Sequence, residues 1–484
     1  RVGGLGLEMY TEIIAVAVVL FYALGIVSAV EAIINVRTAQ GAIAWAISLL
    51  AVPYLAVPCY LVFGRTKFDG YLEQRNAVEQ ETRELLQQTR AEVSKHLVFS
   101  SPAEPVYNAL FNLTGIPAAG GNAVELLVDG QQTFDSILRG LESAQHHILL
   151  ESYIIRDDNL GRRIGRVLSD KARAGVSVHL LYDEIGSRNF HRTGLCRQLR
   201  QTGVQVAAFN TTQGRRNRFQ LNFRNHRKIV VVDGHVAWVG GHNIGDEYLG
   251  LDPDIGHWRD THLRLQGPAV LGVELAFATD WRWATQTSLS VVQPDAEDAH
   301  HGTENVLVFP SDPSSILKQA GLMFLQLIVA AQKRIWIASP YFVPDRSIVS
   351  ALQLAALRGV DVRVMIPDEP DGPVVGMANW SFTRELLPAG VKVYRYQGGF
   401  LHQKVLLMDH HLAGIGTANF DNRSFRLNFE ITLLVDGEHF ANEVQAMLEA
   451  DLLKCREVTP AEIAAKPAWF PLAMGAARLF SPVL

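Results

Sequence analysis

The chain has 484 residues, of which 48% are hydrophobic and 19% are charged, and its formal net charge is −5. A chain of this length is too long for one ordinary core and predicts two or three modules. The high apolar content favours a membrane-associated protein, and the negative charge argues against a general nucleic-acid binder. Three widely spaced cysteines, Cys59, Cys196 and Cys455, predict neither a disulfide framework nor a zinc site.

Two apolar runs near the N-terminus, Ile13–Ile34 and Ala42–Phe63, contain 22 residues each. At about 1.5 Å per residue, a helix of that length crosses the hydrocarbon of a bilayer. We therefore expect residues 1–66 to form a transmembrane helical hairpin. Basic residues after the second run favour a cytoplasmic side for the rest of the chain; they are Arg65, Lys67 and Arg75.

The same region allows two other interpretations. Apolar runs of this kind also form helices buried in the core of a soluble domain. In addition, Glu31 lies near the end of the first run, and Pro53 and Pro58 interrupt the second. These residues allow kinks, or a shallow re-entrant hairpin that does not cross the bilayer.

Residues 67–122 are predicted to connect this module to the rest of the chain. Between Lys67 and His96, charged residues surround Leu85, Leu86 and Val93, which predicts a solvated connecting helix. The stretch 100–122 contains three prolines and three glycines and is interpreted as a linker.

The remainder of the chain carries an internal duplication. The strand-like segment 148–153 matches 335–341, and the helical stretches Leu160–Ala174 and Ser347–Arg358 follow them in turn. Alternating strands and helices predict an α/β fold. We expect two duplicated lobes, residues 123–295 and 296–484, each a mixed sheet flanked by helices, with a site at the seam between them.

The same short motif occurs once in each expected lobe. The first copy consists of His226, Lys228, Asp233, Gly240 and Asn243, and the second of His402, Lys404, Asp409, Gly416 and Asn419. In both copies an apolar run separates the Lys from the Asp, which predicts a buried strand that carries the His and the Lys on one face. One copy alone is equally consistent with a hairpin whose His is a satisfied core or surface residue. Two copies at identical spacing instead predict a phosphoryl-transfer site that supplies a nucleophile, an acid and cationic groups without a metal.

Carboxylates downstream of each motif are candidates to orient the two histidines. By position along the chain, we expect Asp260 to pair with His226 and Glu430 to pair with His402. Either carboxylate could instead pair with a nearby arginine. The motif residues Asp233 and Asp409 are expected to face away from the histidines, where each pins the following turn or crosses the lobe interface.

Several residues are candidates for binding an anionic headgroup. The first copy has an insertion before its His that is rich in arginine and contains Arg215, Arg216, Arg218 and Arg224. Such a segment suits lipid headgroups at a bilayer surface, although a solvated loop of paired arginines is an equal alternative. Tyr153, Tyr341 and Arg423 are further candidates, each of which could equally be a packing residue. The apolar tail 469–484 is expected either to dock on the bilayer or to pack on the second lobe.

Neither a metal nor another cofactor is expected. The adjacent histidine pairs 146–147, 300–301 and 410–411 do not have the spacing of zinc ligands.

These motifs resemble those of the phospholipase D superfamily, and the bacterial cardiolipin synthases look like its most similar branch. Further resemblance lies in residues 37–41, 63–67, 151–153, 340–344 and 419–430, so it extends over nearly the whole chain. One departure is visible, because Gly241 and Thr417 stand where many superfamily members have serine. Both residues are small, and we expect the chemistry to be unchanged.

The resemblance implies transfer of a phosphatidyl group from one phosphatidylglycerol to another, giving cardiolipin and glycerol. His226 would form a phosphatidyl-histidine, and His402 would protonate the departing glycerol and then deprotonate the acceptor. The lysines and asparagines of the motifs would donate to the phosphate oxygens. The partners would be phosphatidylglycerol and membrane lipids rather than nucleic acid, and the protein would be a multi-pass protein of the bacterial inner membrane with a cytoplasmic catalytic body.

Other functions are compatible with parts of the pattern. A membrane-bound phospholipase D would use the same groups and release phosphatidic acid, and a nuclease of the superfamily would cleave nucleic acid. A catalytically silent scaffold would be expected to have lost one of the motif residues, and none is lost here. The two lobes complete one site within a chain, so the chemistry does not require a homo-oligomer, although membrane contacts could favour one.

Overall fold

The structure, a computed structural model, describes residues 2–35, 39–64, 87–96, 104–209, 222–289, 302–315, 317–482 and 484. It divides into two compact units, the first comprising Arg1–Glu73 with Thr211–Phe223, and the second Gln74–Asn210 with Arg224–Leu484. Most of the expected connecting helix, and the arginines at 215, 216 and 218, lie outside the described residues.

The first unit contains one helix that is long and apolar enough to cross a membrane. This helix, α1 (Val2–Asn35), includes a 24-residue apolar stretch, Glu12–Asn35. Most of its apolar side chains are exposed, as at Val19 and Ile34. Exposed apolar side chains around a helix are typical of a segment that meets lipid, so α1 fits membrane association.

The prediction of a second spanning helix is not supported, because the second apolar run is broken. It forms α2 (Ala39–Ala51), α3 (Pro53–Cys59) and a π-helical turn, η1 (Tyr60–Gly64). The break falls at Val52, whose backbone is not helical and which precedes a proline. Among the described residues, therefore, only α1 meets the length and composition of a membrane span.

The short helices pack on α1 through small residues. Ala29 and Ala32 of α1 are buried with Leu49 of α2 and Ala56 of α3. At Gly25, a Cβ atom would lie 2.5 Å from the carbonyl oxygen of Leu49, so only glycine allows this approach between α1 and α2.

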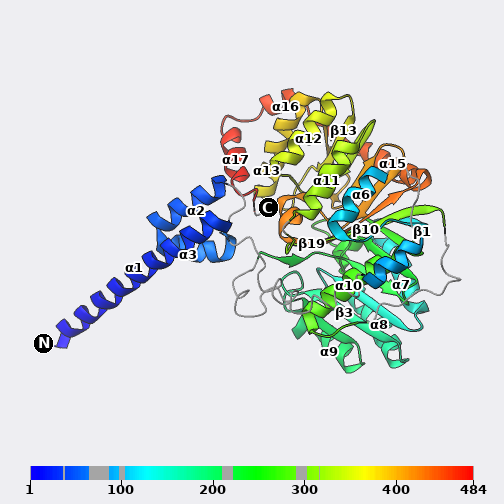
Figure 1. The fold of residues 1–484 in the computed structure, drawn as a ribbon, viewed down its shortest axis with the longest axis horizontal. Helices are drawn as coiled ribbons and strands as arrows, with labels where there is room; N and C mark the ends of the chain where they lie inside the picture. The colour runs from blue at the N-terminus through cyan, green and yellow to red at the C-terminus, as the bar shows by residue number, and fades with distance from the viewer. Residues whose placement is uncertain are drawn as a thin grey trace. The chain divides into compact units, whose positions relative to one another are not determined.

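The second unit is built on one mixed sheet with helices packed around it (Figure 1). The same strand order occurs twice in this sheet. The first lobe (residues 119–209 and 224–289) has the order β1 (Ala119–Val128), β9 (Thr261–Gln266), β7 (Val236–Gly240), β6 (Ile229–Val232), β2 (His147–Ser152), β3 (Ser177–Asp183) and β4 (Gln205–Phe209). The second lobe (residues 302–482) has β10 (Glu304–Ser311), β19 (Asn428–Asp436), β17 (Leu412–Gly416), β16 (Val405–Met408), β11 (Arg334–Ala338), β13 (Asp361–Pro367) and β14 (Lys392–Tyr396), with β20 (Cys455–Glu457) at the edge. Antiparallel pairing of β1 with β10 joins the two lobes. The expected duplication is confirmed.

Helices cover both faces of each half of the sheet. In the first lobe, α7 (Asp129–Ser143), α8 (Asn159–Arg173) and α9 (Gly194–Gln201) share one apolar core with alternate residues of β3, namely Val178, Leu180 and Tyr182. The intervening His179 faces the opposite way, and its ring lies 4.8 Å from that of Trp281 in α10 (Val270–Thr285). This alternation is the period of two of a strand buried on both faces.

The second lobe repeats this arrangement with α11 (Gln319–Ala330), α12 (Arg346–Leu357) and α13 (Pro373–Leu386) on one face of the sheet. The other face meets α15 (Glu438–Leu452), where Trp336 of β11 lies beside Leu448 and Leu452. The predicted strands at 229–232 and 405–408 and the helices at 160–174 and 347–358 are confirmed, the helices to within one residue at each end.

The expected linker at 100–122 is wrong for its described part. Residues 104–114 form α6 (Glu104–Thr114), and β1 begins at Ala119. Pro105 lies in the first turn of α6, where its missing N–H costs nothing, and Gly121 adopts φ 79° at an irregularity in the β1–β10 ladder. These prolines and glycines therefore mark the ends and bulges of elements rather than a linker.

The C-terminal segment contains α17 (Phe470–Arg478), which packs against the second lobe. Phe470 is buried with its ring 5.9 Å from that of Trp380 in α13. Leu472 and Leu479 remain 78% and 80% exposed, so one face of the segment is packed and the other is open.

Candidate active site

The histidine of each motif is placed by a strand pairing that crosses from one lobe to the other. The residues before His226 form β5 (Arg224–Asn225), which pairs in parallel with Asn428–Phe429 at the start of β19. The residues before His402 form β15 (Phe400–Leu401), which pairs in parallel with β8 (Trp258–Arg259). The backbone N–H of His226 donates to Phe429, and that of His402 donates to Arg259. Each histidine therefore lies beside a carboxylate of the opposite lobe, His226 beside Glu430 and His402 beside Asp260.

The predicted pairing of histidines with carboxylates is wrong, because the partners are exchanged. His226 Nδ1 lies 3.0 Å from both carboxylate oxygens of Glu430, and His402 Nδ1 lies 2.7 Å from Asp260 Oδ2. The expectation rested on order along the chain, whereas the crossed ladders β5–β19 and β15–β8 bring each histidine to the other lobe's carboxylate. We call each histidine with its carboxylate a half-site; each half-site takes one residue from each lobe.

Burial and local charge keep both imidazoles neutral. Burial, with Lys228 and Lys404 nearby, lowers the pKa of His226 to about 4 against the opposing effect of Glu430. Burial and Lys404 likewise lower the pKa of His402 to about 3, although Asp260 opposes them. With Nδ1–H donated to a carboxylate, the remaining ring nitrogen, Nε2, keeps a lone pair.

The nearby lysines and histidines lower the pKa values of the two carboxylates and favour their ionised form. Burial alone would raise the pKa of Asp260, but Lys404 and His402 lower it below its usual range. Burial of Glu430 is similarly outweighed by His226 and Lys228, and its pKa is lowered. Each pair is thus a neutral imidazole held by an anionic carboxylate.

The two motif lysines are buried at the same place. Lys228 Nζ donates to the carbonyl oxygen of His226 at 2.7 Å, and Lys404 Nζ lies 2.8 Å from His402 Nδ1 and 3.1 Å from its Nε2. Burial lowers the pKa of Lys228 to about 7 and that of Lys404 to about 8, against the effect of the nearby carboxylates. An anion that entered the site would favour the charged form of both lysines.

The surroundings of the two carboxylates differ. Glu430 accepts hydrogen bonds from Thr417 Oγ1 at 2.6 Å, Ser424 Oγ at 2.8 Å and Asn428 Nδ2 at 3.0 Å. Asp260 accepts from the backbone N–H of Thr261 at 2.8 Å and, more weakly, from Trp258 Nε1 at 3.4 Å.

The two positions after the motif glycines explain part of that difference. Thr417 supplies a hydroxyl to Glu430, whereas Gly241 lies against Asp260, where a Cβ atom would be 2.0 Å from Oδ1. Gly241 therefore leaves room for Asp260 to reach His402 across the lobe interface.

The asparagines of the motifs lie on the same cavity but are held differently. Asn243 accepts from the backbone N–H of Ile154 at 3.1 Å and donates to Tyr248 OH at 3.0 Å. Asn419 is 5% exposed, and among the described residues its Oδ1 has no hydrogen-bond partner. Asn419 is thus the freer of the two to contact a bound molecule.

Asp233 and Asp409, although part of the motifs, do not line the cavity with the histidines. They lie at the far ends of β6 and β16 from the histidines and, as expected, face away from them. Asp233 accepts from the backbone N–H groups of residues 145–147 at 2.7–2.8 Å, and Asp409 from those of residues 332–334 at 2.7–3.2 Å. Both have positive φ, 53° in each case. They hold the entrances of β2 and β11 in their own lobes, so the expectation that each pins the following turn or crosses the lobe interface is wrong.

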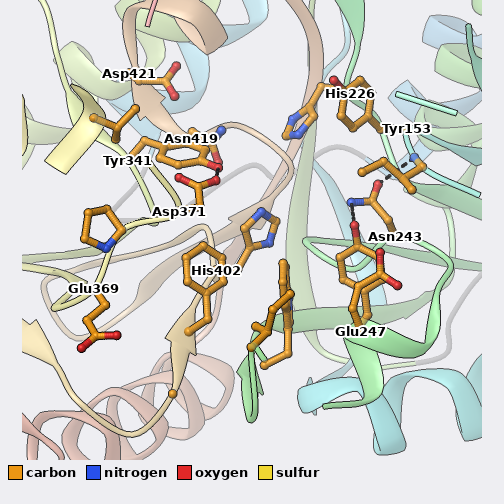
Figure 2. A pocket seen from close by; sticks show the side chains of 18 of the residues that line it. Tyr153, His226, Asn243, Glu247, Tyr341, Glu369, Asp371, His402, Asn419 and Asp421 are labelled. Atoms are coloured by element: carbon orange, nitrogen blue, oxygen red, sulfur yellow. Dashed lines mark hydrogen bonds between the residues drawn. The ribbon is translucent and has the colours of Figure 1, made fainter. Parts of the chain in front are cut away.

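A cavity of about 1020 Å³ opens over the two histidines (Figure 2). Its lining includes His226, His402, Asn243 and Asn419, and also the predicted substrate-contact residues Tyr153, Tyr341, Arg224 and Arg423. The ring of Tyr153 packs edge-on against His226, 5.0 Å between centroids. The site residues predicted from sequence therefore meet in one place, apart from Asp233, Asp409 and the three arginines outside the described residues.

Some lining residues could not be singled out from the motifs. The rings of Trp258 and Phe400 flank His402 at 4.9 and 5.9 Å, and Asp371 accepts a hydrogen bond from the hydroxyl of Tyr341. Position along the chain could have indicated Trp258 and Phe400. They lie two residues before Asp260 and His402, and the ladder β15–β8 places them next to the site. Among the described residues, no group of three or more His, Cys, Asp and Glu side chains is arranged to hold a metal ion.

Comparison with known proteins agrees with the two-lobe organisation of the chain. A family model described as "Cardiolipin synthase, PLD-like domain" matches residues 137–261 and 324–452, one segment in each lobe. The chain is 45% identical over 472 residues to cardiolipin synthase A of Pseudomonas fluorescens, a match that covers 96% of this chain and 98% of the relative. This chain belongs to the cardiolipin synthase family. The resemblance predicted from the motifs is confirmed.

Further similarity supports the same placement. Cardiolipin synthase A of Pseudomonas aeruginosa is 46% identical over 467 residues, covering 95% of this chain and 94% of that protein. The crystal structure of phosphatidylserine synthase from Haemophilus influenzae Rd KW20 shares the fold with a TM-score of 0.58 at 14% identity, covering 78% of this chain and all of that one. The cardiolipin synthase family therefore accounts for both lobes and for the N-terminal unit.

Proposed function

We propose that this protein is a cardiolipin synthase that transfers a phosphatidyl group from one phosphatidylglycerol to another, releasing glycerol. The observation that carries the proposal is the pair of buried histidines that line one cavity, each with its Nδ1 within hydrogen-bond distance of a carboxylate from the opposite lobe. The family membership of the whole chain supports the choice of substrate.

In the first step, Nε2 of His226 attacks the phosphorus of the donor lipid. The bond between phosphorus and the glycerol oxygen breaks, and His402 gives a proton to the departing glycerol. His402 is neutral in the empty site. The negative charge of a bound phosphodiester raises the pKa of a neighbouring imidazole, so uptake of that proton accompanies binding of the donor.

In the second step, the hydroxyl of the acceptor lipid attacks the phosphatidyl-histidine. His402 takes the hydroxyl proton, a new phosphorus–oxygen bond forms, and His226 leaves with the electron pair of the phosphorus–nitrogen bond. Lys228 and Lys404 stabilise the negative charge on the phosphate oxygens as it builds up. Arg224 and Arg423 line the cavity near Tyr153, whose ring packs against His226, and are proposed to hold the donor phosphate.

We also propose that α1 anchors the protein in the bacterial inner membrane with the catalytic body on the cytoplasmic side. The basic residues that follow the apolar segments support this orientation. A C-terminal fusion to a fluorescent protein that matures only in the cytoplasm should be bright, whereas a fusion to periplasmic alkaline phosphatase should be inactive. The reverse result would contradict this orientation.

The test of the reaction uses the full chain, purified in detergent and incubated with labelled phosphatidylglycerol in the presence of a chelator. We expect cardiolipin and glycerol in equal amounts, and the loss of both products in His226→Ala and His402→Ala. Phosphatidic acid as the only lipid product would instead make the protein a phospholipase and refute the proposed acceptor.

A further inference from the structure

Two tyrosines, one from each lobe, line the cavity and have partners of opposite charge. Tyr153 follows β2 and Tyr341 follows β11, and both line the cavity. Burial raises the pKa of Tyr153, and the neighbouring Arg224 and Arg423 oppose that effect. Tyr341 instead donates its hydroxyl hydrogen to the carboxylate of Asp371 (Figure 2). The cavity is basic beside one tyrosine and acidic beside the other.

The loops that supply these surroundings also differ. In the first lobe, Asp183 at the end of β3 is buried and accepts from three backbone N–H groups, those of Ile185, Gly186 and Asn225. In the second lobe, the loop after β13 brings Asp371 to the cavity wall. The first of these acidic groups is structural, whereas the second faces the space that a substrate would occupy.

Asp371 is not neutralised by a basic side chain. Its loop neighbour Asp368 is paired with Arg456 at 2.7 Å, but within the described part of the chain no ion pair includes Asp371. Asp371 is nevertheless close enough to the centre to be one of the carboxylates that oppose the effect of burial on the pKa of Lys404. One oxygen of its carboxylate is hydrogen-bonded to Tyr341, which leaves the other available.

An independent observation points to a bound hydroxyl on this side of the cavity. Asn419, also in the second lobe, lines the same cavity, is 5% exposed, and among the described residues has no partner for its Oδ1. A buried oxygen without a donor costs free energy unless a ligand supplies one. A carboxylate and an amide oxygen together suit a ligand that donates hydrogen bonds, and they repel a second phosphate.

We propose that Asp371, held by Tyr341, accepts a hydrogen bond from the secondary hydroxyl of the acceptor's glycerol headgroup and thereby presents the neighbouring primary hydroxyl to His402. The inference rests on the proposed function and adds the part of the acceptor that is recognised, a vicinal diol. Two anionic lipids must enter one cavity in turn, and an acidic wall makes the second lipid approach with its glycerol rather than its phosphate.

The chemistry of transfer is unchanged by this contact. The primary hydroxyl gives its proton to His402 Nε2 and forms the new bond to phosphorus, while the bond to His226 breaks. Asp371 takes up no proton and acts as a specificity residue. A site built to accept a hydrogen bond from a hydroxyl discriminates strongly against the analogue that lacks it.

The experiment is a competition between two soluble acceptors, deuterated glycerol and 1,3-propanediol, which lacks the secondary hydroxyl. The full chain in detergent receives phosphatidylglycerol as donor with equal concentrations of both acceptors. Mass spectrometry then gives the ratio of deuterated phosphatidylglycerol to phosphatidylpropanediol. This ratio does not depend on the fraction of active enzyme, so a variant that folds poorly still reports it.

In the wild type we expect glycerol to be preferred roughly tenfold to hundredfold, as for a hydrogen bond to a charged group. Asp371→Asn should bring the ratio close to one, and Tyr341→Phe should reduce it partly. The matched control is Glu369→Gln, which removes a charge from the same loop and should keep the wild-type ratio. An unchanged ratio in Asp371→Asn, or an equal loss in Glu369→Gln, would overturn the proposal.

The same assay separates this inference from the proposed function. Wild-type enzyme that forms only phosphatidic acid would refute the transferase reaction itself. Wild-type enzyme that transfers to both acceptors without preference would leave the transferase intact and refute only the diol site.

Discussion

The two half-sites share their reacting groups and differ in what surrounds them. Beside the His226 and Glu430 pair, the crossed ladder joins Arg224 to Asn428. Beside the His402 and Asp260 pair, the equivalent ladder joins Phe400 to Trp258. One half is basic and polar, and the other is aromatic with an acidic loop nearby. Duplication therefore preserved the chemistry while the neighbouring positions diverged, which suits a reaction whose donor and acceptor steps bind different parts of a lipid.

Substitution of the two carboxylates, Glu430 and Asp260, should have the largest effect and should distinguish the two halves of the site. We expect Glu430→Gln to slow formation of the phosphatidyl-histidine roughly 10³- to 10⁴-fold, because the amide no longer fixes the tautomer of the nucleophile His226. Asp260→Asn acts on His402 and should spare attack on a donor whose leaving group needs no proton. With phosphatidyl-p-nitrophenol, rapid mixing should show a stoichiometric burst of nitrophenol from Asp260→Asn and none from Glu430→Gln.

Equal bursts from the two carboxylate variants would contradict this division of roles. A burst from Glu430→Gln alone would reverse it and make His402 the nucleophile.

Asp233 and Asp409 have the same role in the two lobes, so their substitution should have the same effect in both. Each accepts hydrogen bonds from three consecutive backbone N–H groups, so Asp233→Ala and Asp409→Ala should each lower the free energy of unfolding by about 3 kcal/mol. Thermal unfolding of the detergent-solubilised chain measures this, while the rate per folded molecule should change little. Asp170→Ala, at an exposed carboxylate paired with Arg173, is the control and should be near neutral. A large loss of rate at unchanged stability would show instead that both aspartates act in catalysis.

The positions after the motif glycines should respond differently in the two halves. Gly241→Ala places a methyl group against Asp260 and should reduce the rate about a hundredfold, because a small displacement of a positioning group is costly. Thr417→Val removes one donor to Glu430 and should cost about tenfold. Steady-state cardiolipin synthesis measures both, with Gly475→Ala as a control in open space. Full activity in Gly241→Ala would show that Asp260 can move without consequence.

The smallest effect concerns acid stability. The unfolded chain protonates its histidines near pH 6.5, but burial and the lysines lower the pKa of His226 to about 4 and that of His402 to about 3. Between pH 6.5 and the lowered pKa of each histidine, the unfolded state therefore binds more protons than the folded state. The free energy of unfolding falls as the pH is lowered through this window. Replacing His402 by asparagine should reduce the proton uptake on unfolding by about one, measured from thermal unfolding at several pH values. An unchanged slope would mean that His402 is already protonated in the folded site.

The sequence determined the duplication, the strands and helices that flank each motif, and the identity of the reacting side chains. These follow from local rules, because a short continuous apolar run specifies a strand buried on both faces. The expectation that this strand also carries the His and Lys is wrong, since β6 begins at Ile229 and β16 at Val405, after the His and Lys of each motif. The sequence also indicated an interruption at Pro53, next to the break at Val52, although we expected the run to span the membrane. It did not reveal the role of residues 104–122 as a helix and a joining strand.

Only the tertiary structure decided which carboxylate serves which histidine and which residues form the cavity wall. Order along the chain suggested that each histidine would use its own lobe, but the short parallel ladders β5–β19 and β15–β8 exchange the partners. Asp371 and Tyr341 likewise meet only because two loops of the second lobe converge. Contacts of this kind depend on backbone pairing between segments that are distant in sequence, and ladders of two residue pairs are too short for a hydrophobic pattern to specify their register.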